Sequence, residues 1–286
     1  MSFPDTLVAP AGVAARLGDP DLVVLDCRYA LADANAGWQA YGRSHLPGAR
    51  YAHLDTDLSD LGRSGLGRHP LPDPGVFAAI CGRWGIGPDT DVACYDDAGG
   101  ALAAARAWWL LRSCGHRRVA VIDGGWAAWT GAGLPVADDK PPRKIGDLPM
   151  LPSTLGRACE EAGALAAALA RGEILLLDAR AGPRFRGEVE PIDARAGHVP
   201  GARNRPYSAN LAADGGFLPA AELRRQFEAL LQGRAPSQVV HMCGSGVTAV
   251  HNLLAMEHAG LHGSRLYAPS WSGWITDPAR PVATGD

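Results

Sequence analysis

The chain is organised around residues 241–249, which read HMCGSGVTA. A short apolar run, 238–240, precedes this stretch, and an apolar stretch of helical period, 250–259, follows it. A strand, a tight loop and a helix are therefore predicted, with Cys243 where the strand ends. Two glycines let the loop curl so that its amides can form an anion-binding nest, and a helix beginning near Val247 adds its positive end. This setting favours the thiolate and predicts that Cys243 is a nucleophile.

The same landmarks occur twice along the chain, in the same order. Their spacing is nearly constant, from 145 residues (270 − 125) to 153 residues (198 − 45). Such regular recurrence indicates an internal duplication. The matching landmarks are Asp26 with Asp178, His45 with His198, Asp96 with Cys243, and the tryptophan motif at 125–129 with that at 270–274.

Each half alternates strand-like and helix-like segments, which implies a mainly parallel sheet with helices on both faces. Runs such as LVVLD and ILLLD fit strands that are buried on both faces. The predicted fold class is α/β, with two tandem domains. Strands are predicted at Leu22–Asp26, Val92–Asp96, Val119–Asp123, near Ile174 and Val239, and at Arg265–Tyr267, and helices at 76–84, 101–113, 220–231 and 247–259.

The duplication predicts domains at residues 1–137 and 153–286. The segment between them, 138–152, is polar and proline-rich, and is predicted to be a linker. Asp96 stands in the first half where Cys243 stands in the second. Because an aspartate cannot act as a sulfur nucleophile, the first domain is predicted to be inactive, and to serve structure or lend residues to a cleft between the domains.

The composition excludes several classes of function. The chain has 286 residues and a formal net charge of −3, so it lacks the basic footprint of a nucleic-acid-binding protein. It contains no run of about 18 uncharged apolar residues and opens without the pattern of a signal peptide, so no membrane association and a cytoplasmic location are expected. Its six cysteines include no CxxC pair, so no metal site is expected. Because the chain shows no export signal, the cysteines are expected to be reduced rather than paired in disulfides.

Taken together, these motifs resemble the two-domain rhodanese-type sulfurtransferases. The resemblance covers nearly the whole chain, through the repeat, the HxPGA motif at 45–49 and 198–202, the Asp96 loop and CGSGVTA at 243–249. It implies two α/β domains with about five parallel strands each, a cysteine persulfide intermediate, and no metal or organic cofactor. The neutral loop resembles that of 3-mercaptopyruvate sulfurtransferases, since the thiosulfate enzymes carry basic residues directly after the cysteine.

The resemblance also implies the site residues. The segment GPRFRG, 182–187, makes Arg184 the residue that binds the carboxylate of the substrate, a task that suits a guanidinium with paired donors. His69 and Asp57 match the segments that hold a histidine and its partner aspartate, and with Ser245 they would form a relay contributed by both domains. The loop residues implied to hold the substrate are Gly244, Gly246, Val247 and Thr248.

The predicted reaction starts when the Cys243 thiolate attacks the sulfur of a small mercapto-acid held by Arg184. Pyruvate leaves as its enolate, and Ser245, backed by His69 and Asp57, supplies a proton or stabilises the charge. The outer sulfur stays on Cys243 as a persulfide until a thiol, cyanide or a thioredoxin-like protein removes it.

Other functions stay open at this point. Ile192 stands where mercaptopyruvate enzymes usually carry a second arginine, and Arg195 is nearby but shifted, so thiosulfate remains an alternative donor. A persulfide carrier without turnover is a further alternative. Cysteine phosphatases are disfavoured, because Thr248 rather than an arginine closes the loop. His45 and His198 recur in both halves, and are predicted to bond the backbone near turns.

Overall fold

The computed structural model describes residues 3–139, 158–159 and 161–286, which fall into two compact units. Unit 1 contains residues 3–60, 71–139 and 212–217, and unit 2 contains residues 61–70, 158–159, 161–211 and 218–286. The predicted linker lies outside the described residues except for its first two, 138 and 139. The segment 61–70 belongs to unit 2, although in the sequence it lies within the first half.

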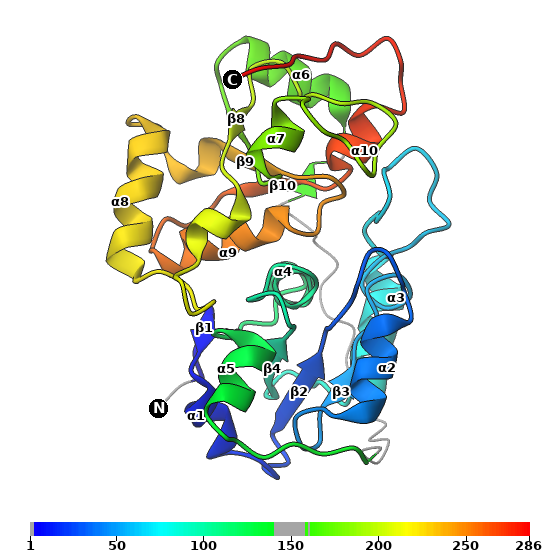
Figure 1. The fold of residues 1–286 in the computed structure, drawn as a ribbon, viewed down its shortest axis with the longest axis vertical. Coiled ribbons are helices and arrows are strands. Elements are labelled where there is room, and N and C mark those ends of the chain that lie inside the picture. Colours follow the sequence, from blue (N-terminus) through cyan, green and yellow to red (C-terminus); the bar gives the residue numbers. More distant parts are fainter. Residues whose placement is uncertain (1–2, 140–157, 160) are drawn as a thin grey trace. The chain divides into compact units, whose positions relative to one another are not determined.

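Unit 1 is built on a five-stranded sheet of order β1-β5-β4-β2-β3, in which every pairing is parallel (Figure 1). The prediction of the strand at Leu22–Asp26 is confirmed residue for residue. The strands are β1 (Leu7–Val8), β2 (Leu22–Asp26), β3 (Arg50–Tyr51), β4 (Asp91–Tyr95) and β5 (Val119–Ile122). The helices that flank them are α1 (Pro10–Ala14), α2 (Ala36–Arg43), α3 (Pro74–Arg83), α4 (Ala104–Ser113) and α5 (Gly125–Gly131).

Unit 2 repeats this architecture. Its sheet has the order β6-β10-β9-β7-β8, again all parallel, which is the order of unit 1 with each strand replaced by its counterpart. The strands are β6 (Ala158–Cys159), β7 (Leu175–Asp178), β8 (Arg203–Asn204), β9 (Val239–Met242) and β10 (Arg265–Tyr267). The helices are α6 (Ala162–Ala170), α7 (Gly182–Phe185), α8 (Ala220–Leu231), α9 (Ala249–His258) and α10 (Ser270–Trp274), with 3-10 turns at η1 (Tyr207–Asn210) and η2 (Pro236–Gln238). The α/β fold class and the duplication are confirmed.

A buried ion pair closes the second strand of each repeat. The Arg28 guanidinium donates to the Asp26 carboxylate at 2.6 Å and to the Ser44 carbonyl, and Arg180 does the same to Asp178 at 2.8 Å and to the Gly197 carbonyl. Pairing is required, since an isolated buried charge would be costly. Each guanidinium also lies over a ring of the repeated tryptophan motif, at 4.3 Å for Trp126 in unit 1 and 4.7 Å for Trp271 in unit 2.

The repeated histidines are structural, as predicted. Nδ1 of His45 donates to the Tyr41 carbonyl at 2.8 Å, and Nδ1 of His198 donates to the Phe185 carbonyl at 2.9 Å. Each imidazole also stacks on an aromatic ring, at centroid distances of 4.2 Å and 3.8 Å. Because the same bonds occur in both units, they explain the HxPGA repeat without catalysis.

Candidate active site

The loop after β9 holds Cys243 in a fixed, buried position. Its side chain is 1% exposed, and its sulfur accepts a hydrogen bond from the Gly246 amide at 3.2 Å. The Cys243 amide donates to Ser270 Oγ at 3.1 Å, which ties the loop to the start of α10. Gly246 has φ = 76°, and a β-carbon there would lie 2.3 Å from the Ala268 carbonyl, so only glycine fits. The nest predicted from the glycines therefore has at least one amide aimed at the sulfur.

The sequence predicts that the helix after the loop begins near Val247, but in the structure it begins at Ala249. The Val250 amide donates to the Val247 carbonyl and the His251 amide to the Thr248 carbonyl, both at 3.2 Å. These are bonds of the tighter 3-10 type, which commonly precede the first α-helical turn. Val247 and Thr248 thus belong to the loop itself.

The matching loop of unit 1 shows what this backbone arrangement can solvate. Asp96 follows β4, is fully buried, and occupies the position of Cys243. Its carboxylate accepts hydrogen bonds from five backbone amides at 2.8–3.1 Å. The donors are the amides of Ala98, Gly100, Leu102, Ala103 and Ala104. A loop of this design is therefore suited to hold a negative charge at the end of the strand.

Ser245 and His69 lie together in unit 2, whereas the resemblance implied that His69 would come from the first domain. Ser245 Oγ and His69 Nδ1 are 2.8 Å apart, and the two side chains are 8% and 3% exposed. Which atom donates depends on the tautomer of the imidazole. The hydroxyl is carried two residues after the cysteine, so this pair can move a proton beside the reactive sulfur.

Asp57, the third member of the predicted relay, belongs to unit 1. Its carboxylate accepts from the His53 amide at 2.8 Å and from Arg83 Nη2 at 3.3 Å. Burial raises the pKa of Asp57, and these two contacts only partly oppose the effect. The participation of Asp57 in a relay stays a prediction.

Arg184, on α7, is held against the Cys243 loop by two carboxylates. Its Nε and Nη2 donate to Glu190, at 3.2 and 2.6 Å, and Nη2 also donates to Asp193 at 3.0 Å. Burial opposes ionisation of Glu190, but the bonds from Arg184 and from the amides of residues 192 and 193 outweigh it and lower the pKa of this carboxyl. A β-carbon on Gly244 would lie 3.8 Å from both Nη1 and Nη2 of Arg184, so the guanidinium faces the loop.

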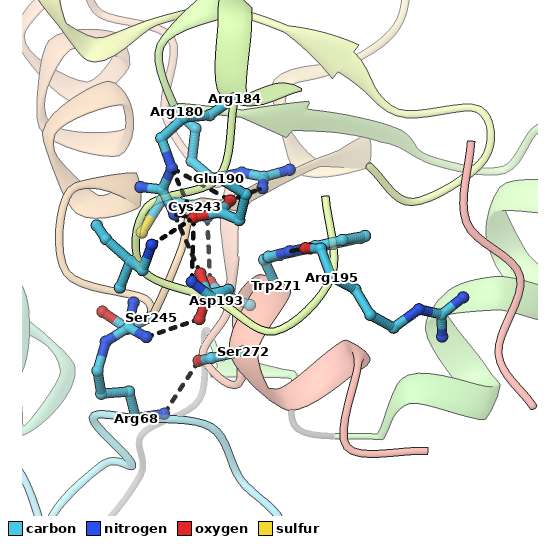
Figure 2. A network of polar contacts seen from close by, with 12 residues as sticks. Arg68, Arg180, Arg184, Glu190, Asp193, Arg195, Cys243, Ser245, Trp271 and Ser272 are labelled. Atoms are coloured by element: carbon cyan, nitrogen blue, oxygen red, sulfur yellow. Dashed lines mark hydrogen bonds and ion pairs between the residues drawn. The ribbon is translucent and has the colours of Figure 1, made fainter. Parts of the chain in front are cut away.

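Arg68 joins the same cluster, and sequence reasoning missed it (Figure 2). Its Nη1 donates to the Asp193 carboxylate at 2.7 Å, and its backbone amide donates to Ser272 Oγ at 3.0 Å. Asp193 is 3% exposed and so bridges two guanidiniums inside the protein. The only signal in the sequence was that Arg68 precedes His69 in the motif GRHPLP.

Arg195 and Ile192 do not supply a second cation beside the loop. Arg195 Nη1 donates to the carbonyls of residues 278 and 280, both at 3.4 Å, and Figure 2 shows its side chain extending away from Cys243. The Ile192 side chain is 43% exposed and apolar, and only its amide bonds Glu190, at 3.1 Å.

Comparison with known proteins decides the family. The family model of the rhodanese-like domain matches twice, at residues 9–132 and 161–277, which are the two repeats. The chain belongs to the rhodanese family. A rhodanese loop thus surrounds Cys243 in unit 2, and a rhodanese loop without the cysteine surrounds Asp96 in unit 1.

The relatives of this rhodanese carry the names of two activities. A Pseudomonas aeruginosa protein named a probable 3-mercaptopyruvate sulfurtransferase is 51% identical over 98% of each chain. A Mycobacterium tuberculosis protein that is 40% identical, over 98% of this chain and 97% of its own, carries the name putative thiosulfate sulfurtransferase. The solved structure of 3-mercaptopyruvate sulfurtransferase from Leishmania major superposes with a TM-score of 0.83 at 33% identity, covering 96% of this chain and 76% of that one.

The described parts of this rhodanese also bear on membrane spanning and metal binding. No helix there combines the length and the apolar character that crossing a membrane requires. The described residues also contain no group of three or more His, Cys, Asp or Glu side chains placed to hold a metal ion.

Proposed function

We propose that this rhodanese is a sulfurtransferase that takes sulfur from 3-mercaptopyruvate and carries it on Cys243 as a persulfide. The observation that carries the proposal is the Cys243 loop, in which the sulfur is buried and accepts from the Gly246 amide. The duplicated loop supports it, since there five amides solvate the Asp96 carboxylate in the same place. The names of the relatives from Pseudomonas aeruginosa and Leishmania major support the choice of donor.

The chemistry proposed for this site balances without a further reactant. The Cys243 thiolate attacks the thiol sulfur of the donor, the carbon–sulfur bond breaks, and its electron pair leaves with the pyruvate enolate. The enolate takes a proton from the Ser245 hydroxyl, and His69, 2.8 Å from that oxygen, replaces it. Gly244, Gly246, Val247 and Thr248 form the loop that surrounds the sulfur, and Arg184 binds the carboxylate.

The charges around Gly244 favour a donor with a single negative charge. Three arginines and three carboxylates form one network there, so their formal charges cancel. A carboxylate can use the remaining guanidinium donors, whereas thiosulfate would bring two charges into a neutral site. The members of the network are Arg68, Arg180, Arg184, Asp178, Glu190 and Asp193.

The acceptor, the domains and the location of the protein are part of the same proposal. We expect a thiol or cyanide to remove the outer sulfur, with a thioredoxin-like protein as the acceptor in the cell, and a cytoplasmic setting. The domains are proposed at 1–137 and 153–286, with the sulfur chemistry confined to unit 2. Asp57 is proposed to support His69 from unit 1.

Parallel assays test the proposal. Turnover of 3-mercaptopyruvate and of thiosulfate is measured at equal subsaturating concentrations with cyanide as the acceptor. Higher catalytic efficiency with mercaptopyruvate, and release of many pyruvate molecules per protein molecule, are expected. Faster turnover of thiosulfate would overturn the choice of donor, and release of a single pyruvate per protein would indicate a carrier rather than an enzyme.

A further inference from the structure

Ser270 adopts a backbone conformation that residues with a side chain rarely take. Its φ is 53°, in the left-handed region, and its side chain is fully buried at the start of α10. Glycine is the usual occupant of this region, because a β-carbon there lies close to the backbone. Gln232, exposed at the end of α8, is the other such residue in the part of the chain that the structure describes. Strain of this kind in a buried residue calls for a compensating interaction.

The first repeat has glycine at the matching position. Gly125 precedes Ser270 by 145 residues (270 − 125), the offset of the tryptophan motif, and its φ is 52°. In both units the amide of the tryptophan that follows donates at 2.9 Å to the carbonyl of the residue after the strand, Asp96 or Cys243. A β-carbon on Gly125 would lie only 2.3 Å from that carbonyl oxygen of Asp96. The turn itself is therefore satisfied by glycine, and the serine of unit 2 needs another explanation.

The hydroxyl of Ser270 bonds the backbone of the reactive cysteine. It donates to the Tyr267 carbonyl at 3.0 Å, and its oxygen accepts from the Cys243 amide at 3.1 Å. The carbonyl groups of Cys243 and Gly244 accept from the next two amides of α10, both at 2.9 Å. Both backbone polar groups of Cys243 are thus bonded to α10, which restrains the two peptide planes that flank its α-carbon.

The direction of the Cys243 sulfur depends on these peptide planes. The sulfur accepts from the Gly246 amide at 3.2 Å, so its present direction places it on a donor of the loop. In the proposed reaction a second sulfur is added to this one and removed again in each cycle. The loop stabilises the charge only if its amides stay aimed at the sulfur, and a small displacement of reacting groups lowers the rate.

We infer that Ser270 is a positioning residue of the sulfur-transfer reaction, whose hydroxyl fixes the Cys243 peptide and so aims the sulfur at the amides of its loop. The inference rests on the proposed function and extends it to a group that does not touch the donor. The backbone strain at Ser270 is the consequence of placing a hydroxyl where glycine would be less strained.

The test compares Ser270→Ala with Ser270→Gly. Both variants remove the hydroxyl, but only glycine relieves the backbone. With mercaptopyruvate, both are expected to lower kcat about 10-fold, as loss of one buried hydrogen bond predicts. KM should change less than about twofold, because the groups that bind the donor stay in place. In urea, Ser270→Gly should unfold at a higher midpoint than Ser270→Ala. Activity would then follow the hydroxyl and stability the β-carbon, a separation that a purely structural serine would not show.

Two variants elsewhere in unit 2 serve as matched controls. Gln232→Gly relieves the same backbone conformation away from the Cys243 loop. Ser264→Ala removes a fully buried hydroxyl that bonds no other group in the described part of the chain. Both should keep the kcat and KM of the parent protein. If Ser264→Ala lowered kcat as much as Ser270→Ala, loss of any buried hydroxyl would be sufficient and the inference would fail.

Measurements with two donors separate this inference from the proposed function. Turnover by the parent protein tests the function, and the ratio of variant to parent tests Ser270. Because the hydroxyl acts on Cys243 and not on the donor, the ratio should be the same with mercaptopyruvate and with thiosulfate. If the parent protein is a carrier without turnover, the rate at which the sulfur adduct forms on Cys243, followed by mass spectrometry, gives the same ratio.

Three results would overturn the role of Ser270 while leaving the sulfurtransferase intact. The first is an unchanged kcat in both variants. The second is a loss in Ser270→Ala that Ser270→Gly restores, since the β-carbon rather than the hydroxyl would then matter. The third is a loss confined to KM, which would place Ser270 in the binding of the donor.

Discussion

Replacing Asp96 with asparagine is expected to destabilise unit 1 strongly. Oδ1 accepts from two backbone amides and Oδ2 from three. An asparagine keeps one acceptor oxygen and places an amide group at the other position, where it faces donors. At least two charge-assisted bonds are lost in either orientation, which amounts to about 3–6 kcal/mol at about 1.5–3 kcal/mol each. Burying a neutral group instead of a carboxylate relieves part of this cost.

Urea unfolding followed by tryptophan fluorescence measures the effect. Six of the eight tryptophans lie in unit 1, so the signal reports mainly on that unit. With a slope of roughly 2 kcal/mol per molar urea, the midpoint should fall by about 1–3 M. Asp97→Asn is the matched control, because Asp97 is exposed.

The outcome that would refute the reasoning is an Asp96→Asn protein that unfolds at the midpoint of the parent protein. The five amides would then not depend on a carboxylate, and the argument that such a loop solvates an anion would lose its basis. An equal loss of stability in Asp97→Asn would show that the effect comes from the net charge of the loop.

Three further outcomes follow from the site. Cys243→Ser should abolish turnover and the sulfur mass adduct after treatment with the donor; an adduct on Cys27 or Cys94 would move the site. His69→Ala should slow turnover about 10²-fold, since it removes the group that reprotonates Ser245, and unchanged kcat would remove the relay. Burial lowers the pKa of His241 to about 3. The free energy of unfolding should therefore decrease as the pH is lowered from about 6.5 to about 3, because in this range the unfolded chain binds a proton that the folded chain does not. His241→Leu should flatten that dependence in pH-scanned unfolding, and an unchanged slope would contradict it.

The architecture could be predicted from the sequence because its signals are local. Short apolar runs closed by a polar residue mark parallel strands that are buried on both faces, and Leu22–Asp26 is found as predicted. The duplication was visible because each landmark recurs in order. The helix after Cys243 begins two residues later than the sequence predicts. The spacing of apolar residues does not distinguish hydrogen bonds of the 3-10 type from those of an α-helix, so this difference could not be predicted.

Part of the candidate site could also be predicted from the sequence alone. A cysteine at a strand end, followed by glycines and a helix, has a chemical meaning that does not depend on distant residues. The resemblance to a known family, rather than the local sequence, implied the roles of Arg184, Ser245 and His69. The structure places these three residues around that loop. Asp57 was inferred in the same way, and its role stays a prediction.

Tertiary structure alone decided that unit 2 receives the segment 61–70, which carries Arg68 and His69. His69 meets Ser245 across 176 residues of sequence, and Arg68 meets Asp193 across 125. Contacts between residues this far apart in the chain produce no periodic pattern in the sequence, because they depend on where a loop packs in the folded protein and not on the local sequence of that loop. Gly67 and Gly273 permit that packing by close approach of backbones, and a buried carboxylate then orients two guanidiniums that the sequence shows only as separate charges.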